Sequence, residues 1–577
     1  MWGKGYQIVA KKIFPSPNPL TPEDTATQIR KLFPTVEETK WNRVPVEEEP
    51  EEFTVDEMEA AVARSKNKKA PGPDGIPAEI LKAAAESDPQ LLLETINEQW
   101  KKGQFPQEWK KARLVLIEKA TEEKADKKYR PICLLNSISK LYERLIKGRL
   151  EKELERKGDL HEMQFGFRKG RSTIDAISEV LKVAEEINSV SYQHRHLGML
   201  VTLDIRNAFN SLRWQDIVEE LAERNIDGNI RRVVQDYLTD RYIQTAHGEE
   251  YKMSCGVPQG SVLGPLLWNI VYDGVLKLRM PKGVKLVAFA DDLAVVARAK
   301  KQEALKRNVE EAVERVREKL QELGLELAAQ KTEAVILAGR RLYTNDMIRV
   351  GEADILTKPW IRYLGVVIDK DARMTKHVEN VAAKAAKYAT NIARILPNTK
   401  GPREARRRIY AGVALSVILY AAPTWSKALN FKKYEATLER VNRTLAIRVA
   451  RAYRTVSLEA ILVIASMPPL SLLVRERRAV QEGATKLEAR EDTMESWERR
   501  WAEKGQGWTK RLIPHVKAWV GRSHGSVTYH LAQFLTGHGV FNVYRKRIGK
   551  AASGTCWYCP EEDTAEHTFF HCPEWEQ

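Results

Sequence analysis

Two apolar segments that carry aspartates constrain the fold of this chain more than any other feature. One is "LGMLVTLDI" (residues 197–205), with Asp204 near its end, and the other is "LVAFADDLAVVAR" (residues 286–298), interrupted by Asp291 and Asp292. Short, apolar, β-branched runs predict buried strands, and the adjacent aspartates predict the tip of a tight hairpin. Because an unpaired buried carboxylate is costly, each of these aspartates needs a partner.

A divalent metal ion is the partner that best fits these carboxylates. If the two segments are neighbouring strands of one sheet, Asp204 and Asp291 converge at one edge, and a cation offsets their repulsion. All-oxygen ligands favour Mg²⁺, with a phosphate-bearing substrate completing its coordination. Two such ions clamp the attacking and leaving oxygens in phosphoryl transfer. Ordinary turn chemistry remains the alternative, since Asp-Asp is common at hairpin turns.

The charge balance favours a polyanionic partner. Lys and Arg number 94 against 78 Asp and Glu, which gives a formal net charge of +16. Nucleic acid is the usual partner of such a chain, although a merely soluble basic protein has the same composition. The N-terminus lacks a signal-peptide core, and the longest apolar run, residues 411–423, is too short to span a bilayer. We therefore expect an intracellular protein that does not enter membranes.

The C-terminal tail predicts a small metal site. Its spacing is Cys556-x2-Cys559-x7-His567-x4-Cys572. Thiolates and an imidazole at such short intervals are typical of a closed, structural Zn²⁺ site. We expect His567 rather than His571 to complete it, because His571 adjoins Cys572 and cannot easily share the ion with it.

The rest of the pattern predicts a mixed α/β half followed by a helical half. Residues 1–52 have no sustained period and look like an extended lead-in. Thr54 and Glu57 form a capping box, which predicts a helix that runs to about residue 67. From about residue 371, strand signals fade and helical, basic patterns take over.

An ordered series of motifs resembles a known family. "FADD" between two apolar strands resembles the palm hairpin of non-LTR retrotransposon reverse transcriptases. "LDIRNAFNSL" resembles the motif with that family's first catalytic aspartate, and "GVPQGSVLGPLLWNI" resembles the motif between the two. The other blocks that match, in the expected order, are "KAPGPDGIPAEIL", "YRPICLLNSISKLYERLI", "QFGFRKGRSTIDAI", "GLELAAQKTEAVIL" and "YLGVVIDKD". The insect clade that inserts into ribosomal DNA and telomeric repeats fits best, given "HLAQFLTGHGVFNVYRKRIG" and the Cys/His tail.

The resemblance covers roughly residues 50–577 and implies an α+β fold, the polymerase right hand of fingers, palm and thumb with an antiparallel palm sheet. The implied parts are an extended lead-in (1–52), fingers and palm (53–370), a helical thumb (371–470), a helical C-terminal region (471–550) and a CCHC zinc knuckle (551–577). In this family the knuckle helps to bind template RNA or target DNA; a purely structural clip is the alternative.

The resemblance also assigns roles to the acidic residues and to one aromatic residue. Asp204 and Asp291 match the carboxylates that hold both Mg²⁺ ions, and Asp292 matches a residue with a weaker, orienting part. Phe209 falls at the steric-gate position, where a ring crowds a 2′-hydroxyl and favours deoxynucleotides. A plain core phenylalanine beside a strand is the alternative for Phe209.

Five further residues match positions around the incoming nucleotide. Gln259 and Gly260 fall where the family lines the nucleotide pocket. Lys119 and Arg130 lie in finger blocks and would contact the triphosphate, or are solvated surface charges. Lys331 matches the lysine assigned as general acid for pyrophosphate release.

The implied function is that of an RNA-directed DNA polymerase, a nucleotidyltransferase. It would copy an RNA template from a DNA primer or target, using dNTPs, two Mg²⁺ ions and one structural Zn²⁺. Such a protein is expected in the nucleus, with a cytoplasmic ribonucleoprotein stage. The family usually carries an upstream endonuclease, and nothing like it precedes Met1, so we expect a fragment of a longer reading frame or a truncated copy. An inactive remnant that at most binds nucleic acid is the competing hypothesis, and a maturase or telomerase relative fits the motifs less well.

Overall fold

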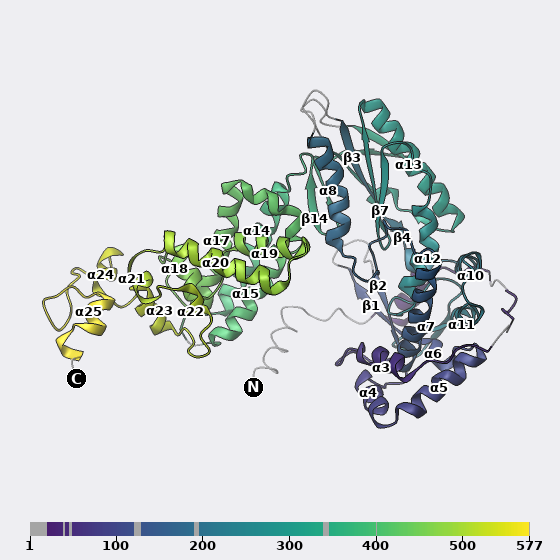
Figure 1. Cartoon of the computed structure of the whole chain (residues 1–577), viewed down its shortest axis with the longest axis horizontal. Helices are drawn as coiled ribbons and strands as arrows, with labels where there is room; N and C mark the ends of the chain where they lie inside the picture. The colour runs from purple at the N-terminus through teal and green to yellow at the C-terminus, as the bar shows by residue number, and fades with distance from the viewer. Residues whose placement is uncertain are drawn as a thin grey trace. The chain divides into compact units, whose positions relative to one another are not determined.

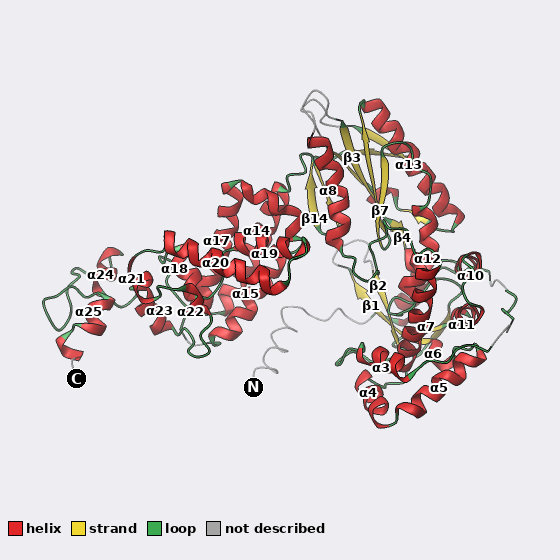
Figure 2. Cartoon of the chain, viewed as in Figure 1, coloured by secondary structure: helices red, strands yellow, loops and turns green. Residues whose placement is uncertain are grey.

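The chain divides into two compact units (Figure 1). The computed structural model describes residues 20–37, 41–45, 49–119, 129–189, 196–337, 346–399 and 401–575. The first unit comprises Met1–Val183, His194–Ala334 and Asn345–Thr357, and the second comprises Ala184–Gln193, Val335–Thr344 and Lys358–Gln577. Figure 2 shows that the first unit mixes helices and strands, whereas the second is mainly helical.

The two aspartate-bearing segments form neighbouring strands of one sheet. Its order is β10-β3-β8-β7, with the bounds β3 Leu197–Leu203, β7 Val284–Phe289, β8 Asp292–Ala299 and β10 Glu333–Leu337. β8 pairs antiparallel with both β3 and β7. Six of the seven residues of β3 are buried, which explains why this strand reads as a continuous apolar run. The antiparallel sheet and the hairpin predicted from "FADD" are thus confirmed.

A second sheet and a set of helices complete the first unit. The sheet has the order β2-β1-β5-β6, with the bounds β1 Lys111–Glu118, β2 Tyr129–Leu135, β5 Tyr242–Gln244 and β6 Glu250–Lys252. The short strands are β4 Ile205–Arg206, β9 Glu326–Leu327, β11 Met347–Val350 and β12 Ala353–Leu356. The helices are α2 Pro22–Leu32, α3 Val55–Ala63, α4 Ala78–Ser87, α5 Pro89–Lys102, α6 Gln107–Lys110, α7 Ser137–Arg156, α8 Thr173–Ser189 (which crosses the division), α9 Ala208–Ser211, α10 Trp214–Glu223, α11 Gly228–Leu238, α12 Gly264–Leu276 and α13 Gln302–Glu322, with a 3-10 turn, η2, at Ala329–Lys331. α13 packs on β3, β7 and β8 and so covers the central sheet.

The N-terminal region differs from the extended lead-in that the sequence predicted. The described part of residues 1–52 contains α2, which begins after Thr21, whose side chain accepts a hydrogen bond from the backbone N–H of Asp24. A capped start with proline in the first turn stabilises a helix too short to show a sustained period. The capping box of Thr54 and Glu57 is present and starts α3, but the helix ends at Ala63, earlier than predicted.

The second unit is a hairpin followed by helices. The hairpin is β13 Trp360–Tyr363 with β14 Val366–Asp369, and the helices are α14 Thr375–Ile395, α15 Glu404–Ile418, α16 Ala422–Trp425, α17 Lys432–Ala450, α18 Leu458–Ile464, α19 Leu470–Gln481, α20 Lys486–Lys504, α21 Gly507–Leu512, α22 Val516–Val520, α23 Tyr529–Thr536, α24 Asn542–Arg547 and α25 Ala565–Phe570, with 3-10 turns at Ser426–Asn430 (η3) and Pro573–Trp575 (η4). Along α14, Ala382, Ala385 and Ala389 are buried while Lys384 and Lys387 are exposed. This helix therefore packs by its alanine face, against α15 and α17, and presents lysines to solvent.

Within the described ranges, no single helix is long and apolar enough to cross a membrane. One pair of segments, Glu404–Ile418 with Ala422–Asn430, passes that test only when taken together, and the two are bent by 56° relative to each other.

Candidate active site

The sheet brings the three aspartates to one end. In the register of β3 with β8, Leu203 pairs with Leu293, so Asp204, the next residue after β3, lies at the same end as Asp292. Asp291 lies at the tip of the β7–β8 hairpin, after Ala290, whose φ of 59° makes the tight turn. Antiparallel pairing thus produces the convergence that the sequence suggested, although metal binding by these residues remains a prediction.

The carboxylates repel one another in a poorly hydrated place. Desolvation, reinforced by the charge of Asp204, raises the pKa of Asp291. Desolvation and then the charges of Asp291 and Asp204 raise the pKa of Asp292 to about 6, although the residue as a whole is exposed to solvent. Such mutual repulsion is what a bound cation relieves, so this end of the sheet has the electrostatics of a cation site.

Lys331 supplies a positive charge to this cluster. It lies at the end of η2 and forms an ion pair with Asp204 through its Nζ. In the described part of the chain, the three aspartates are not among the groups whose three or more potential ligand atoms all lie within 4.8 Å of one another. The residue types fit Mg²⁺, and the ion pair with Lys331 supplies a positive charge to Asp204 in this structure.

Gln164, to which the sequence assigned no role, holds the hairpin turn. Its Oε1 accepts hydrogen bonds from the backbone N–H of Ala290 (3.0 Å) and of Gly166 (2.9 Å), and its Nε2 donates to the Ala290 carbonyl (3.3 Å). The side chain is only 1% exposed. A Cβ on Gly166 would lie 2.1 Å from the Ala290 nitrogen, so glycine is needed there. Together these contacts fix the backbone that carries Asp291.

Phe209 lies on α9, close behind Asp204 in the chain, and is half-buried. Its ring packs against the fully buried ring of Trp268 (5.1 Å between centroids) and meets the half-exposed Phe167 edge-on (5.8 Å). Its carbonyl accepts a hydrogen bond from Val257 (2.8 Å), which ties α9 to the loop before Gln259. The ring is thus half-buried between two aromatic neighbours, and its role as a steric gate stays a prediction.

The loop that contains Gln259 and Gly260 is anchored by its backbone. The Gln259 carbonyl accepts a hydrogen bond from the N–H of Cys133 on β2 (2.8 Å). Gly260 has a φ of +139°, and a Cβ there would lie 2.2 Å from the Cys133 carbonyl oxygen. Only glycine permits this approach to β2. The Gln259 side chain stays half-exposed at the surface of the loop.

Glu143 holds the other end of this loop and was not found by sequence reasoning. It lies on α7 with none of its surface exposed. Its Oε2 accepts from the Ser261 hydroxyl (2.6 Å) and from the backbone N–H groups of Val262 (2.6 Å) and Leu263 (2.9 Å). Because Ser261 donates to Glu143, Tyr237 must donate to the Ser261 oxygen (2.8 Å). The loop is therefore fixed by a buried charge, for which an amphipathic helix pattern gives no signal.

Lys119 and Arg130 come from the second sheet and lie near the three aspartates. Lys119 directly follows β1, Arg130 pairs with Ile117 in the β1–β2 ladder, and both are exposed. Desolvation, and then the charges of Lys331 and Arg130, lower the pKa of Lys119. Asp204 and Asp291 act on the same ammonium in the opposite direction. The predicted cationic residues and the aspartates are therefore close enough for their charges to interact.

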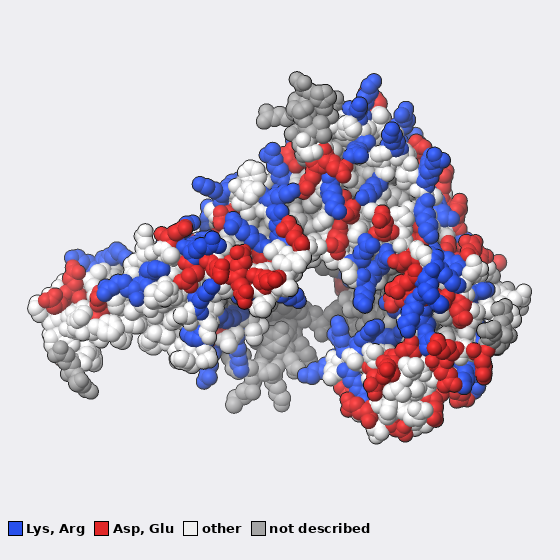
Figure 3. Space-filling view, viewed as in Figure 1, with Lys and Arg blue, Asp and Glu red and all other residues white. Residues whose placement is uncertain are grey.

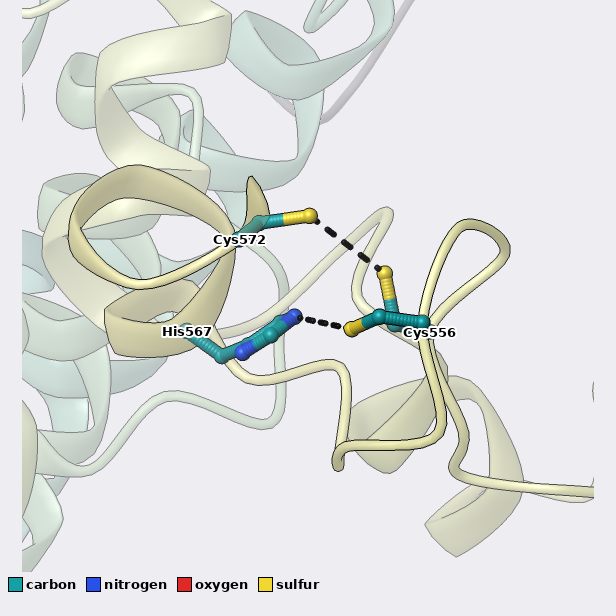
Figure 4. Close-up of side chains that lie close together, drawn as sticks. Cys556, His567 and Cys572 are labelled. Carbon is teal, nitrogen blue, oxygen red and sulfur yellow. Dashed lines mark hydrogen bonds between the residues drawn. The ribbon is translucent and has the colours of Figure 1, made fainter. Parts of the chain in front are cut away.

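The four residues predicted as zinc ligands also come together, within the second unit (Figure 4). Their ligand atoms, from Cys556, Cys559, His567 and Cys572, all lie within 4.8 Å of one another. The Cys556 and Cys572 sulfurs are 3.8 Å apart, far longer than a disulfide of ~2.05 Å. Two sulfurs at ~2.3 Å from a tetrahedral Zn²⁺ lie about 3.8 Å apart, so the spacing suits a shared ion. His571 is not a member of this group.

Local hydrogen bonds shape this cluster before any ion binds. Cys556 donates its N–H to the Glu561 carbonyl (2.8 Å), which closes the turn around Cys559. Thr564 caps α25 by accepting from the N–H of His567 (3.0 Å), which places the imidazole on the first turn of that helix. Although desolvation opposes it, hydrogen bonds from the Tyr558 backbone and from His567 lower the pKa of Cys556 to about 7. A thiol that ionises readily is a better metal ligand.

Basic side chains are not gathered into one obvious track on the face shown in Figure 3. Lysines and arginines cluster where α7 lies, and acidic groups cluster over α4 and α5. On α7, however, Lys147 pairs with Glu151, and Lys152 pairs with Glu57. The positive charge there is largely neutralised within the protein, so this patch alone does not identify a nucleic-acid surface.

Comparison with known proteins finds similarity to reverse transcriptases. Residues 118–368 match the family model described as reverse transcriptase (RNA-dependent DNA polymerase). The chain is 29% identical over 564 residues to the putative 115 kDa protein in type-1 retrotransposable element R1DM of Drosophila melanogaster, covering 91% of this chain and 53% of that protein. It is 26% identical over 560 residues to the retrovirus-related Pol polyprotein from type-1 retrotransposable element R1 of Bradysia coprophila, covering 91% and 55%.

A further transposon protein and a solved structure also match the chain. The probable RNA-directed DNA polymerase from transposon X-element of Drosophila melanogaster is 27% identical, covering 67% of this chain and 43% of that protein. A solved telomerase from Candida albicans, in complex with a TWJ fragment of telomeric RNA, aligns at a TM-score of 0.35 and 14% identity over 75% of this chain and 69% of that one; a likeness that low adds nothing to the assignment. The chain spans about half the length of the R1 proteins it matches. The matched domain contains the aspartates, Phe209 and the Gln259 loop in the order that the motifs predicted, and residues 118–368 are similar to reverse transcriptases, including those of non-LTR retrotransposons.

Proposed function

We propose that the chain is an RNA-directed DNA polymerase that extends a DNA primer with deoxynucleotides on an RNA template. The observation that carries this proposal is the cluster of Asp204, Asp291 and Asp292 at one end of a buried sheet, inside a domain of the reverse transcriptase family. Proteins that match the chain are named as RNA-directed DNA polymerases, which supports the same activity here.

In this proposal the aspartates hold two Mg²⁺ ions. Asp204 and Asp291 would hold both ions, and Asp292 would help to orient these two carboxylates through the hairpin. Bound there, such ions would supply Lewis-acid activation of the primer 3′-hydroxyl and neutralisation of phosphate charge. The chain's own contribution is rigidity, because β3, β8 and the Gln164 contacts fix where the carboxylates lie. Positioning of this kind supplies much of the rate in phosphoryl transfer.

The surrounding side chains would bind and select the nucleotide. Phe209 closes the space beside the sugar, so that a 2′-hydroxyl meets its ring and deoxynucleotides are preferred. Gln259 and the close-lying backbone at Gly260 line the base and sugar. Lys119 and Arg130 contact the triphosphate, and Lys331, once it has left Asp204, neutralises or protonates the pyrophosphate.

Nucleic acid and zinc complete the proposal. An RNA template and a DNA primer or target would meet basic faces such as the exposed lysines of α14, through salt-sensitive backbone contacts. One Zn²⁺ bound by Cys556, Cys559, His567 and Cys572 would hold the C-terminal turn and α25 together. Atomic absorption of the purified chain should then find about one zinc per molecule.

Primer extension tests the polymerase directly. The purified chain, given an RNA template annealed to a DNA primer, Mg²⁺ and dNTPs, should lengthen the primer, and Asp291→Asn should not. No extension by the intact, folded chain would favour the competing hypothesis of an inactive remnant that only binds nucleic acid. Extension that survives Asp291→Asn would show that the active site lies elsewhere.

We further propose that the protein works in the nucleus, where target DNA lies, after assembling with its RNA in the cytoplasm. The basic net charge of +16 suits both associations. Imaging of a tagged chain in insect cells tests this, and a protein confined to the cytoplasm, with or without its RNA, would contradict it.

A further inference from the structure

A cavity in the second unit is lined by rings and arginines and is unrelated to the candidate active site. Its volume is about 880 Å³, a size typical of small-ligand pockets. Its walls come from the loop before α18, from α21, from the turn after α23, from α24 and from the start of α25. The lining includes the side chains of Trp508, Arg511, His538, Tyr544 and Arg547.

One wall is a set of stacked groups held by hydrogen bonds. The His538 ring stacks on Tyr544 (4.6 Å between centroids, 19° between planes), and the Arg547 guanidinium lies 5.2 Å from the centre of the Tyr544 ring. Arg547 donates to Nε2 of His538 (2.8 Å), so Nδ1 must donate to the hydroxyl of Thr455 (3.0 Å). Thr455 in turn shares a hydrogen bond with the Tyr544 hydroxyl (2.9 Å). This wall is therefore rigid before any ligand arrives.

Another part of the lining combines an indole with a second arginine. Trp508 is half-exposed, and its Nε1 donates to the Phe534 carbonyl (2.7 Å), which fixes the ring. The Arg511 guanidinium lies 5.5 Å from that ring and makes a two-pronged ion pair with Glu566 on α25, with both contacts at 2.7 Å. Because α25 also carries His567, the zinc cluster and this wall share one short helix.

We propose that this cavity binds an unpaired nucleotide of a single-stranded nucleic acid, with its base between Trp508 and His538 and its phosphates near Arg547. Aromatic side chains that stack bases beside cations that meet phosphates are the chemistry of single-strand binding sites. Glu566 is the one acidic residue lining the cavity and is already neutralised by Arg511. The last turn of α24 adds Arg545 beside Arg547, which suits a strand with several phosphates better than a free nucleotide.

The proposal rests on the proposed function only in assuming that the chain handles nucleic acid, and it needs no catalysis. A duplex keeps its bases stacked within the helix and cannot offer one to the cavity. An acidic peptide would meet the same arginines but would gain little from two aromatic rings. RNA and DNA strands share the base and the phosphate, so both are used in the experiment that tests the proposal.

Photo-crosslinking with site mapping tests the proposal on the full chain. Short single strands of RNA or DNA carrying 5-iodouracil are titrated onto the protein without dNTPs, irradiated, and the crosslinked peptides are identified. We expect crosslinks in the peptides that contain Trp508, His538 or Tyr544, with the RNA and DNA arms showing which strand is preferred. A matched duplex should give few such crosslinks. Crosslinks confined to other peptides, or equal yields from duplex and single strand, would overturn the proposal.

Variants separate stacking from general charge attraction. Trp508→Leu should raise the strand concentration for half-maximal crosslinking at His538 or Tyr544 about tenfold, as expected for one lost stack, while Trp508→Phe should retain most of the binding. Strands with abasic sites should not distinguish Trp508→Leu from the unchanged protein. Arg547→Gln should weaken the site, whereas Lys546→Gln, a neighbour that does not line the cavity, is the matched control. Equal effects of these two substitutions would reduce the site to nonspecific attraction and so contradict it.

The same assay in Asp291→Asn keeps the two proposals apart. Crosslinking at the cavity should be unchanged in this variant, which lacks polymerase activity if the proposed function is correct. If the intact chain fails to extend primers but still crosslinks at the cavity, the polymerase proposal fails and this one stands. If Trp508→Leu does not fold, as judged by circular dichroism, the mapping in the unchanged protein and the Arg547→Gln pair still decide the question.

Discussion

Replacing Glu143 should loosen the loop that presents Gln259 without touching any residue that meets the substrate. Glu143 is fully buried, and its Oε2 accepts three hydrogen bonds, from Ser261, Val262 and Leu263. Glu143→Gln keeps the shape and one acceptor oxygen but removes the charge. Glu143→Ala removes the acceptor altogether and leaves two backbone N–H groups and the hydroxyls of Ser261 and Ser139 without it in the protein interior.

The expected magnitudes follow from these contacts. Hydrogen bonds to a charged group contribute about 1.5–3 kcal/mol each and neutral ones about 0.5–1.5 kcal/mol. When the acceptor loses its charge, the three hydrogen bonds become weaker by roughly 3 kcal/mol in total. An amide is easier to bury than a carboxylate, which offsets part of this loss. We therefore expect Glu143→Gln to lower the free energy of unfolding by about 1–2 kcal/mol. Glu143→Ala leaves these buried donors without an acceptor, at about 1–3 kcal/mol each, so it should cost about 3–5 kcal/mol in total.

The assay combines thermal unfolding with steady-state primer extension. Since the loop lines the proposed nucleotide pocket, Glu143→Gln should raise the KM for dNTP several-fold, with a smaller change in kcat and an unchanged Mg²⁺ requirement. Glu151→Gln, on the same helix but in a partly exposed pair with Lys147, is the matched control and should change neither stability nor KM appreciably. A Glu143→Ala protein with normal melting temperature and normal KM would refute the idea that this carboxylate holds the loop.

Four further outcomes are expected. Asp291→Asn should abolish primer extension while leaving the circular dichroism spectrum unchanged, because removing one of the repelling carboxylates does not weaken the sheet. Phe209→Val should let the enzyme incorporate ribonucleotides, so that the ratio of kcat/KM for dNTP over rNTP falls at least tenfold; an unchanged ratio would mean that Phe209 is only a core residue. Cys559→Ser, or a strong chelator, should release the zinc and lower the melting temperature of the C-terminal region, as measured by metal analysis and by proteolysis of residues 541–575. Burial lowers the pKa of His377 to about 4, and its Nδ1 accepts a hydrogen bond from the N–H of Val367 (3.2 Å). The folded protein therefore binds fewer protons than the unfolded chain between about pH 4 and 6.5, and the free energy of unfolding should fall by up to about 3 kcal/mol as the pH drops through that window. His377→Gln should reduce the dependence of the melting temperature on pH across the same window.

The parts of the fold that the sequence predicts well are those set by local pattern. The run at residues 197–203 and the hairpin around Asp291 are apolar enough to be strands in any buried setting, and pairing them is the simplest way to satisfy their backbones. The capping box at Thr54 specifies a helix start in the same local way. Helix α2 escaped detection because a short helix capped by Thr21 leaves no sustained periodicity.

In the candidate site, too, the sequence predicts the residues that have a local signal and misses those placed by the tertiary fold. Aspartates and cysteines stand out because their chemistry is costly or unusual in their settings, and the spacing of Cys556 and Cys559 is itself a local signal. The ion pair of Lys331 with Asp204 joins residues 127 positions apart, and the tertiary fold alone determines which lysine reaches the carboxylate. The same holds for the cavity around Trp508, whose walls come from five separate segments.

The residues missed by sequence reasoning share one physical task, which is to bind backbone rather than substrate. Gln164 satisfies the turn at Ala290, and Glu143 satisfies the turn after Gly260. Tight turns that carry functional side chains leave N–H groups unpaired, and a buried N–H without a partner costs about 1–3 kcal/mol. A site built on two such turns therefore requires buried polar side chains from elsewhere in the chain. It follows that substitutions at Gln164 and Glu143 should impair activity through geometry, and that an amide or carboxylate at these positions is as much a requirement of the site as the aspartates are.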